Sequence, residues 1–109
     1  NAAYYATKKA GNPIHATYNY GDKSVYLIND QLENARKLKL VIKIFDIQSN
    51  KFFEKTIHSD IKANSSKNME KLPVFTNLSD TYFISLKVYD NGKEIDDNFY
   101  WISKKQDVL

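Results

Sequence analysis

The sequence has 109 residues, of which 42% are apolar, 27% are charged and 14% are aromatic, and its formal net charge is +3. This length supports one domain with a two-layer core, and it excludes a large enzyme scaffold such as an α/β barrel of about 250 residues. The charge excess is small and the lysines are scattered, so the basic face of a nucleic-acid-binding protein is not predicted.

The N-terminal residues 2–10 are rich in alanine and precede Gly11, Asn12 and Pro13, which are typical of the end of a regular element. The segment is compatible with one or two helical turns and equally with an extended linker. We favour a linker with some helical character, joining this domain to a preceding one.

Strands are predicted where apolar residues recur at every second position. The first four expected strands are residues 14–20, 24–29, 38–47 and 52–58. In the third of these, the residues expected to face the core are Leu38, Leu40, Ile42 and Ile44. A turn at residues 21–22, a loop or single helical turn at 30–37 and a turn at 48–51 would connect the four strands.

The next part of the chain is polar and its structure is harder to assign. Residues 59–71 are rich in Asn, Ser and Lys, which indicates a loop crossing between sheets, with part of it possible as an edge strand. Residues 72–75 are short and apolar, and Pro73 favours an edge strand or the start of a strand.

The C-terminal part predicts a long β-hairpin. Asn91-Gly92 favours a type I′ turn, because both central residues of that turn need positive φ. A two-residue turn would pair Val88 with Ile95. One apolar strand face before the turn is formed by Tyr82, Ile84, Leu86 and Val88.

The final strand contains acidic residues, and its register decides which side chains are buried. Regular alternation would place Asp97 on the core face, whereas a bulge near Asp96-Asp97 would turn Tyr100 and Ile102 inward. We favour the bulge, because an unpaired buried carboxylate is expensive. Phe99 and Trp101 would then lie on an outer face that a neighbouring domain could cover.

These elements predict an all-β fold, an immunoglobulin-like β-sandwich of about seven antiparallel strands. Leu78, Asp80 and Tyr82 support it, because their L-x-D-x-Y spacing is typical of a tyrosine corner. The expected domain spans residues 13–104. Residues 1–12 would be a linker from a preceding domain, and residues 105–109 would begin a linker to a following one.

No catalytic residue, metal ligand or cofactor-binding residue is predicted. Asp96 and Asp97 are adjacent and would point to opposite faces of a strand, whereas glycoside hydrolysis needs two converging carboxyl groups. Nothing in the spacing of His15 and His58 places a carboxylate beside both. Without cysteine, neither a disulfide nor a thiolate zinc site can form. No apolar run approaches the roughly 20 residues of a membrane-spanning helix, so no membrane contact is expected.

Aromatic residues are the remaining candidates for a binding role. We predict Tyr4, Tyr5, Phe99 and Trp101 as contacts to neighbouring domains. The alternative is that exposed aromatic residues stack on sugar rings, for which the candidates are Tyr4, Tyr5, Tyr18, Tyr20, Tyr26 and Trp101.

Two stretches of the sequence resemble a domain of glycoside hydrolase family 2. They are YYATKKAGNPIHATYNYGDKSVYLIND near the start and YFISLKVYDNGKEIDDNFYWIS near the end. Both are similar to the immunoglobulin-like domain that follows the catalytic barrel in the exo-β-D-glucosaminidase and β-mannosidase branch. The residues that resemble the exit from the barrel are Tyr5, Lys8, Lys9, Ala10, Pro13 and His15. Those that resemble the closing strand are Asn98, Phe99, Tyr100 and Trp101.

The resemblance implies a non-catalytic accessory domain within a retaining glycosidase that removes terminal β-linked glucosaminides or mannosides. The catalytic glutamates of that family lie in the barrel, and no position here corresponds to them. The implied partners are neighbouring domains of the same polypeptide and, through the whole enzyme, a polysaccharide. The implied location is secreted or periplasmic. A stand-alone carbohydrate-binding module and a protein-interaction β-sandwich remain alternatives.

Overall fold

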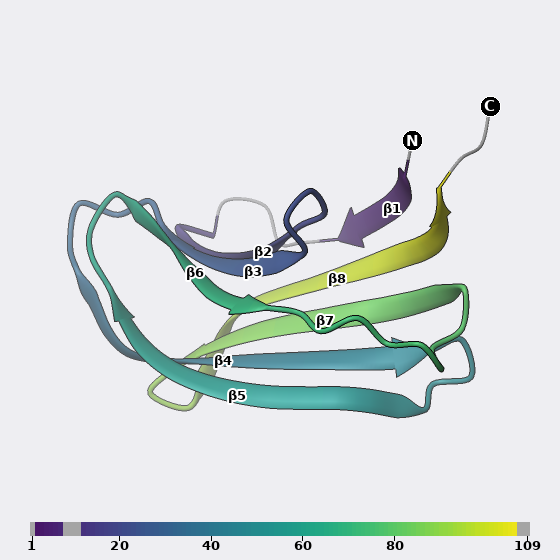
Figure 1. Ribbon diagram of the computed structural model, residues 1–109. Coiled ribbons are helices and arrows are strands. Elements are labelled where there is room, and N and C mark those ends of the chain that lie inside the picture. The colour runs from purple at the N-terminus through teal and green to yellow at the C-terminus, as the bar shows by residue number, and fades with distance from the viewer. Residues whose placement is uncertain (1, 8–11, 107–109) are drawn as a thin grey trace.

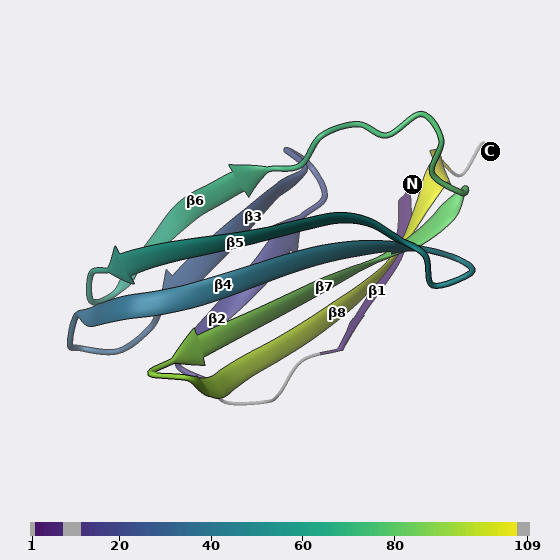
Figure 2. The same cartoon turned by 90° about the horizontal axis from the view of Figure 1, so that it is seen from below.

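The structure is a computed structural model that describes residues 2–7 and 12–106, with the side chains of residues 12–103. Every regular element in this part of the chain is a β-strand, and the strands form two stacked antiparallel sheets (Figures 1 and 2). The prediction of an all-β, immunoglobulin-like sandwich is confirmed. The described residues form eight strands, one more than the approximate number expected, because the N-terminal segment adds a strand.

The larger sheet has five strands in the order β1-β8-β7-β4-β5. They are β1 (Ala2–Thr7), β4 (Ala35–Asp46), β5 (Lys51–Ile61), β7 (Thr81–Asp90) and β8 (Lys93–Gln106). The smaller sheet has the order β2-β3-β6 and consists of β2 (Ile14–Asn19), β3 (Ser24–Asn29) and β6 (Ser65–Lys71).

Strand β1 differs from the expected helical linker. It pairs with β8 in antiparallel fashion, with Tyr5 opposite Trp101 and Thr7 opposite Phe99. The expectation of helical character is therefore wrong for Ala2–Thr7, because the free hydrogen-bonding groups along β8 favour an extended partner. Likewise, β8 continues to Gln106, beyond the predicted domain end at residue 104. The domain boundaries themselves stay predictions.

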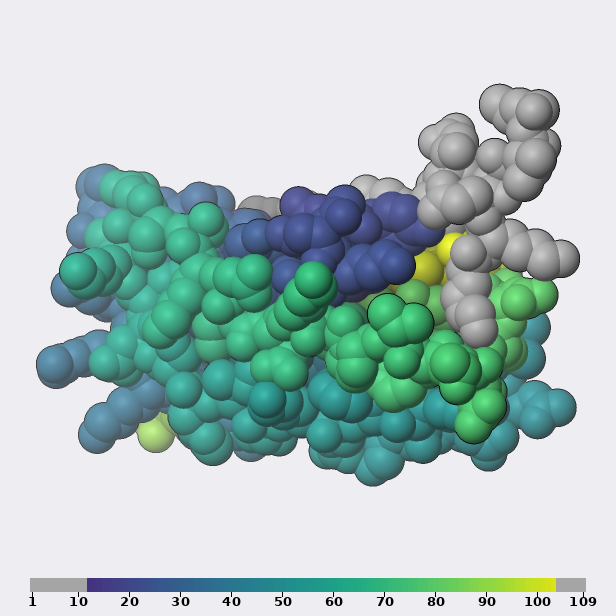
Figure 3. Space-filling view, in the orientation of Figure 1, coloured from purple at the N-terminus to yellow at the C-terminus, as the bar shows by residue number. Residues whose placement is uncertain are grey.

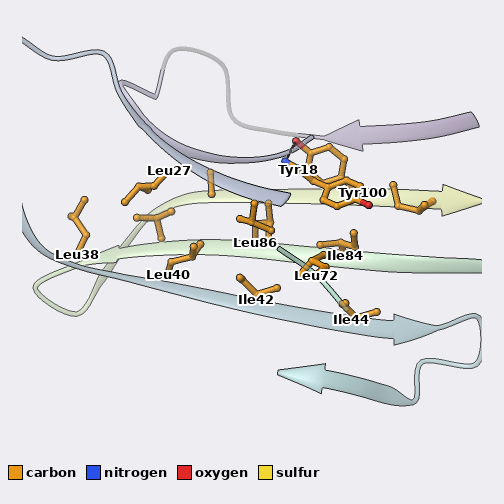
Figure 4. Close-up of a cluster of buried hydrophobic side chains, with 14 of the residues drawn as sticks. Tyr18, Leu27, Leu38, Leu40, Ile42, Ile44, Leu72, Ile84, Leu86 and Tyr100 are labelled. Carbon is orange, nitrogen blue, oxygen red and sulfur yellow. Dashed lines mark hydrogen bonds between the residues drawn. The ribbon is translucent and has the colours of Figure 1, made fainter. Parts of the chain in front are cut away.

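The core between the sheets follows the predicted alternation. On β4, the four predicted core residues are at most 1% exposed: Leu38, Leu40, Ile42 and Ile44. The facing sheet contributes Ala16, Tyr18, Val25 and Leu27, also buried (Figure 4). Burying each large aliphatic side chain contributes about 1.5–3 kcal/mol, so this double layer is the main source of stability.

The polar segment predicted as a crossing loop contains a regular strand, β6, which pairs with β3. The alternative of an edge strand is the correct one. Only one side of β6 pairs and much of it is exposed, so its polar side chains remain in water while Met69 packs against the core. Residues 72–75 form no strand, although Leu72 is buried in the core. In Figure 3, β6 and the segment after it (green) lie between β3 (blue) and β5 (teal).

The hairpin between β7 and β8 has the predicted turn. Asn91 has φ = 53° and Gly92 has φ = 81°, so both central residues occupy the left-handed region. This turn starts β8 directly after β7 and sets the register of the first residues of β8.

A bulge shifts that register two residues later. Tyr89 pairs with Glu94 and Val88 pairs with Asp96, which leaves Ile95 as the extra residue on β8. The predicted pairing of Val88 with Ile95 is wrong, because the bulge lies before Asp96 rather than at the acidic pair.

The effect of the bulge on the core is largely the expected one. Tyr100 and Ile102 turn inward and are 5% and 1% exposed. Asp97 stays out of the core, as predicted, but Asp96 is completely buried. A buried carboxylate is tolerated here because hydrogen-bond donors surround it, as described below.

Replacing Gly92 with alanine is expected to lower the free energy of unfolding by about 1 kcal/mol, because a Cβ is strained at this positive φ. The matched variant Asn91→Gly should change it by much less, since glycine adopts the same φ without strain. Urea denaturation of the three proteins measures the difference. Equal stability of Gly92→Ala and the parent chain would show that the turn does not require positive φ.

Asp46 organises the turn between β4 and β5. Its Oδ1 accepts hydrogen bonds from the Gln48 amide at 2.9 Å and the Asn50 amide at 2.8 Å, and Asn50 Nδ2 donates to Oδ2 at 3.0 Å. Partial desolvation of the carboxyl opposes ionisation, but the bonds from Asn50 and Gln48 outweigh it and hold the pKa of Asp46 below its usual value.

This lowered pKa predicts a loss of stability in acid. The folded chain binds the proton of Asp46 more weakly than the unfolded chain, so the contribution is complete above the unfolded pKa of about 4. It should disappear as the pH falls through the lower folded pKa. Urea midpoints between neutral pH and acid should therefore fall less steeply for Asp46→Asn than for the parent. An unchanged slope in Asp46→Asn would contradict the prediction.

Candidate functional site

Strand β8 presents two different faces. Its inward face carries Asp96, Asn98 and Tyr100, which are all buried, and its outward face carries Phe99 and Trp101. Successive side chains of a strand point to opposite faces, so whatever fixes the inward set also fixes the outward one.

The carboxylate of Asp96 binds the N-terminal part of the smaller sheet. Its Oδ2 accepts a hydrogen bond from the Ala16 amide at 3.0 Å, and its Oδ1 accepts one from Asn12 Nδ2 at 2.8 Å. Both oxygens are thus used in holding the chain together, which explains why the burial of Asp96 is compatible with folding.

The next two inward side chains extend this arrangement along β2. Asn98 Nδ2 donates to the Ala16 carbonyl at 3.0 Å and to Tyr100 Oη at 3.2 Å. Tyr100 Oη in turn accepts from the Tyr18 amide at 3.0 Å (Figure 4). We call Asp96, Asn98 and Tyr100 the β8 ladder.

The β8 ladder satisfies backbone groups that the smaller sheet leaves open. Strand β2 pairs with β3 along one side only, and alternate residues of such a strand point their N–H and C=O groups away from the partner. Side chains of β8 bind those groups. A slip of β8 by one residue would break every one of these bonds, so the outward position of Phe99 and Trp101 is strongly specified.

Tyrosines fill the space beside the ladder. The rings of Tyr18 and Tyr100 are edge to face, with centroids 5.8 Å apart. Burial, together with the neighbouring Tyr82, raises the pKa of Tyr18, and burial also raises the pKa of Tyr82. Tyr82 shares a side-chain hydrogen bond with Tyr18. The tyrosine corner predicted around Tyr82 stays a prediction.

The outer face of the larger sheet carries an aromatic cluster. In the sheet register Phe45 lies opposite Phe83, and Phe83 lies opposite Trp101. The rings of Phe83 and Phe99 are stacked, with centroids 5.4 Å apart, and the ring of Trp101 lies 6.3 Å from that of Phe83. Phe99 is 37% exposed and Trp101 is 53% exposed. We call Phe45, Phe83, Phe99 and Trp101 the aromatic patch.

The other half of the same face is charged and internally paired. Lys39 Nζ lies 4.6 Å from the ring centroid of Tyr89, and Lys87 Nζ lies 3.4 Å from a carboxylate oxygen of Glu94. The negative charge of Glu94, and secondarily that of Asp97, raises the pKa of Lys87. This half therefore has the pairing expected of a surface in water, and the aromatic patch does not.

The structure places the predicted contact residues on neighbouring strands. Phe99 and Trp101 are brought together, as expected of one surface. Tyr4 and Tyr5 lie on β1, with their backbone opposite Ile102 and Trp101, but their side chains lie outside the described residues. The interdomain role of all four stays a prediction.

Two members of the aromatic patch were missed as contact candidates. Phe45 and Phe83 occupy outward positions on β4 and β7, where alternation with buried Ile44 and Ile84 could have placed them. Their proximity to Trp101 depends on the register between β4, β7 and β8, which could not be predicted from the sequence.

The histidines and the cavity were also considered as possible sites. His15 lies on β2 and His58 on β5, in different sheets, and no group of acidic or histidine side chains within residues 12–103 could hold a metal ion. A cavity of about 230 Å³ opens at one end of the sandwich, lined in part by Lys23, Phe75 and Tyr82. In the part of the chain that the structure describes, no helix is long and apolar enough to cross a membrane.

Known proteins are similar to this chain in sequence and in fold. The family model of the mannosidase Ig/CBM-like domain matches residues 21–107. An exo-β-D-glucosaminidase of Amycolatopsis orientalis is 31% identical over 112 residues, which cover 100% of this chain and 11% of that protein. An exo-β-D-glucosaminidase of Streptomyces avermitilis is 30% identical over 111 residues, which cover 98% of this chain and 12% of that protein.

A solved structure agrees with the sequence relatives. The crystal structure of the exo-chitosanase CsxA of Amycolatopsis orientalis superposes with a TM-score of 0.86 and 28% identity, over 93% of this chain and 12% of that one. The predicted resemblance to a domain of the exo-β-D-glucosaminidases is confirmed, and the chain spans only about an eighth or less of the relatives' length. With a family model matching most of its residues, this immunoglobulin-like sandwich belongs to the mannosidase Ig/CBM-like domain family.

Proposed function

We propose that this chain is a non-catalytic accessory domain of a larger retaining glycoside hydrolase that removes terminal β-linked glucosaminide units. The observation that carries the proposal is that the whole chain matches a small part of proteins named exo-β-D-glucosaminidase. In the proposed arrangement the domain follows the catalytic barrel and holds it in place relative to the other domains.

The positions of the carboxylates support a non-catalytic role. A glycosidase needs two carboxyl groups facing each other across the scissile bond, about 5–9 Å apart. The adjacent Asp96 and Asp97 lie on opposite faces of β8, and both oxygens of Asp96 bind groups of the same domain. This pair is therefore unsuited to acid–base chemistry on a sugar.

The proposal is tested by comparing the full-length protein with this 109-residue segment. The full-length protein should release p-nitrophenol from p-nitrophenyl β-D-glucosaminide, and the segment should not. The first sugar product, followed by NMR, should be the β-anomer if the mechanism is retaining. Activity of the segment alone would overturn the non-catalytic role. A full-length protein that cleaves only p-nitrophenyl β-mannoside would overturn the glucosaminide specificity.

A second candidate function is sugar binding by the domain itself. The exposed rings of Phe99 and Trp101 favour it, because sugars stack on aromatic rings in many binding sites. Trp101 is the only tryptophan of the 109 residues, so its fluorescence reports directly on this surface. A saturable change on titration with glucosamine oligosaccharides would favour the sugar-binding module, and an unchanged spectrum would favour the accessory domain.

A further inference from the structure

We propose that the aromatic patch is the surface through which this domain packs against another domain of the same polypeptide. The inference rests on the proposed function, which makes the chain one domain of a larger enzyme. It identifies the side of the sandwich that the other domain covers and the residues of this domain that form the covered surface.

The first argument is where apolar surface is exposed. The described large apolar residues that remain exposed are Leu32, Ile47, Phe52, Val74, Phe99 and Trp101. Ile47 follows the end of β4, two residues beyond Phe45, and Phe52 is the second residue of β5, just after the same turn. Two of the six, Phe99 and Trp101, belong to the aromatic patch, and Ile47 and Phe52 flank the turn that follows Phe45, whereas Leu32 and Val74 lie singly in other loops. Clustered apolar surface of this kind marks a contact site, and scattered residues do not.

The second argument comes from the contrast within one sheet face. In the half nearest the β7–β8 turn, Lys87 pairs with Glu94 and Lys39 lies over the ring of Tyr89. In the aromatic half the ring of Phe83 stacks on Phe99 and contacts the tilted ring of Trp101, and two of the rings remain in contact with solvent. The aromatic half also carries Lys43, which lies opposite Ser85 beside Phe99, but its four aromatic side chains give it the aromatic enrichment that is typical of the core of a protein interface.

The third argument concerns the course of the chain. Strand β1 begins and β8 ends at the end of the sandwich where β4 ends and β7 begins, which is the end that carries the aromatic patch (Figure 1). Tyr5 of β1 pairs directly with Trp101. The relatives continue far beyond the matched segment, so covalently attached domains would be held close to this surface. Such a link raises the effective concentration of a neighbour to the millimolar range, so a modest apolar area is enough to bind it.

Charge argues against a polymeric sugar as the occupant. A polymer of glucosamine is cationic and would be recognised by unpaired carboxylates beside the rings. The carboxylate next to Phe99 on the outward face of β8 is Asp97, which already interacts with Lys87. The whole chain has a net charge of +3. A neighbouring protein domain fits this surface better.

Hydroxyl-radical footprinting of the full-length protein tests the inference. Trypsin cleaves after Lys93 and Lys104, so Phe99 and Trp101 are read together in the peptide of residues 94–104, and Leu32 is read in that of residues 24–36. Labelling of each residue is expressed relative to the same protein unfolded in urea. Leu32, which is 88% exposed in this domain, is the internal control for an uncovered side chain.

We expect Phe99 and Trp101 to be protected severalfold relative to Leu32, at every protein concentration and without added sugar. Labelling of Trp101 to about half of its unfolded value, as its 53% exposure in the single domain implies, would overturn the inference. Protection that disappears on dilution would assign the surface to a second copy, and protection that needs glucosamine oligosaccharides would assign it to sugar. Either result would also overturn it. Because these outcomes are read without an activity assay, they are distinguishable from a failure of the proposed function.

A pair of variants gives an independent measurement. Trp101→Ala should lower the melting temperature of the full-length protein by several degrees more than Leu32→Ala does, and by more than it lowers that of the isolated segment. Equal losses from Trp101→Ala in both proteins would show that Trp101 acts only within its own domain.

Discussion

Replacing Tyr100 with alanine is expected to lower the free energy of unfolding by about 4 kcal/mol, one of the largest losses that a single substitution can cause in this domain. The ring is 5% exposed and packs edge to face on Tyr18, so its removal leaves a cavity between the sheets. The hydroxyl accepts the amide hydrogen of Tyr18, which would be left buried without an acceptor. Urea denaturation of the 109-residue chain measures the loss.

The matched variant Tyr100→Phe separates the two contributions. It keeps the ring and removes the hydroxyl, which accepts from the Tyr18 amide and from Asn98 Nδ2, so a loss of about 1–2 kcal/mol is expected. If phenylalanine were as damaging as alanine, packing of the ring would contribute nothing. If phenylalanine were harmless, the hydrogen bonds that the hydroxyl accepts from the Tyr18 amide and Asn98 Nδ2 would not stabilise the fold.

Asp96→Ala is expected to lower the free energy of unfolding by about 3 kcal/mol, because the Ala16 amide and Asn12 Nδ2 lose their acceptor together. Asp96→Asn should cost less, since its amide oxygen can still accept from Ala16 and its nitrogen can donate to a rotated Asn12 amide. Chemical denaturation of both variants provides the measurement.

The neighbouring residue offers a control for this substitution. Asp97 lies on the other face of β8 and is partly exposed, so Asp97→Ala should change stability by about 0.5 kcal/mol or less. Similar losses from Asp96→Ala and Asp97→Ala would mean that the buried hydrogen bonds do not distinguish the two carboxylates, contrary to the structure.

The parts of the fold that were predictable from sequence are those fixed by local patterns. The alternation from Leu38 to Ile44 requires one buried strand face, and Asn91-Gly92 requires a tight hairpin, whatever surrounds them. Strand β6 was not predictable in the same way. It carries few apolar side chains, and it is a strand because β3 offers it a backbone partner.

The position of the bulge shows a second limit. Avoiding a buried acid correctly suggested a bulge, yet the chain buries Asp96 instead of Asp97. The burial of Asp96 is stabilised by hydrogen bonds from the Ala16 amide and Asn12, which are about 80 residues away in sequence. The outward positions of Phe99 and Trp101 were still predicted correctly, because a bulge at either place gives the later part of β8 the same facing. Phe45 and Phe83 join them only through the register between strands.

The β8 ladder has a consequence for self-association. The open side of a strand at the margin of a sheet is a template on which another chain can add a strand, and this is a common route to aggregation. In this domain the Ala16 amide and carbonyl and the Tyr18 amide are already occupied by side chains of β8. Asp96 and its companions therefore protect the domain against intermolecular strand addition along β2, independently of what they contribute to the stability of a single molecule.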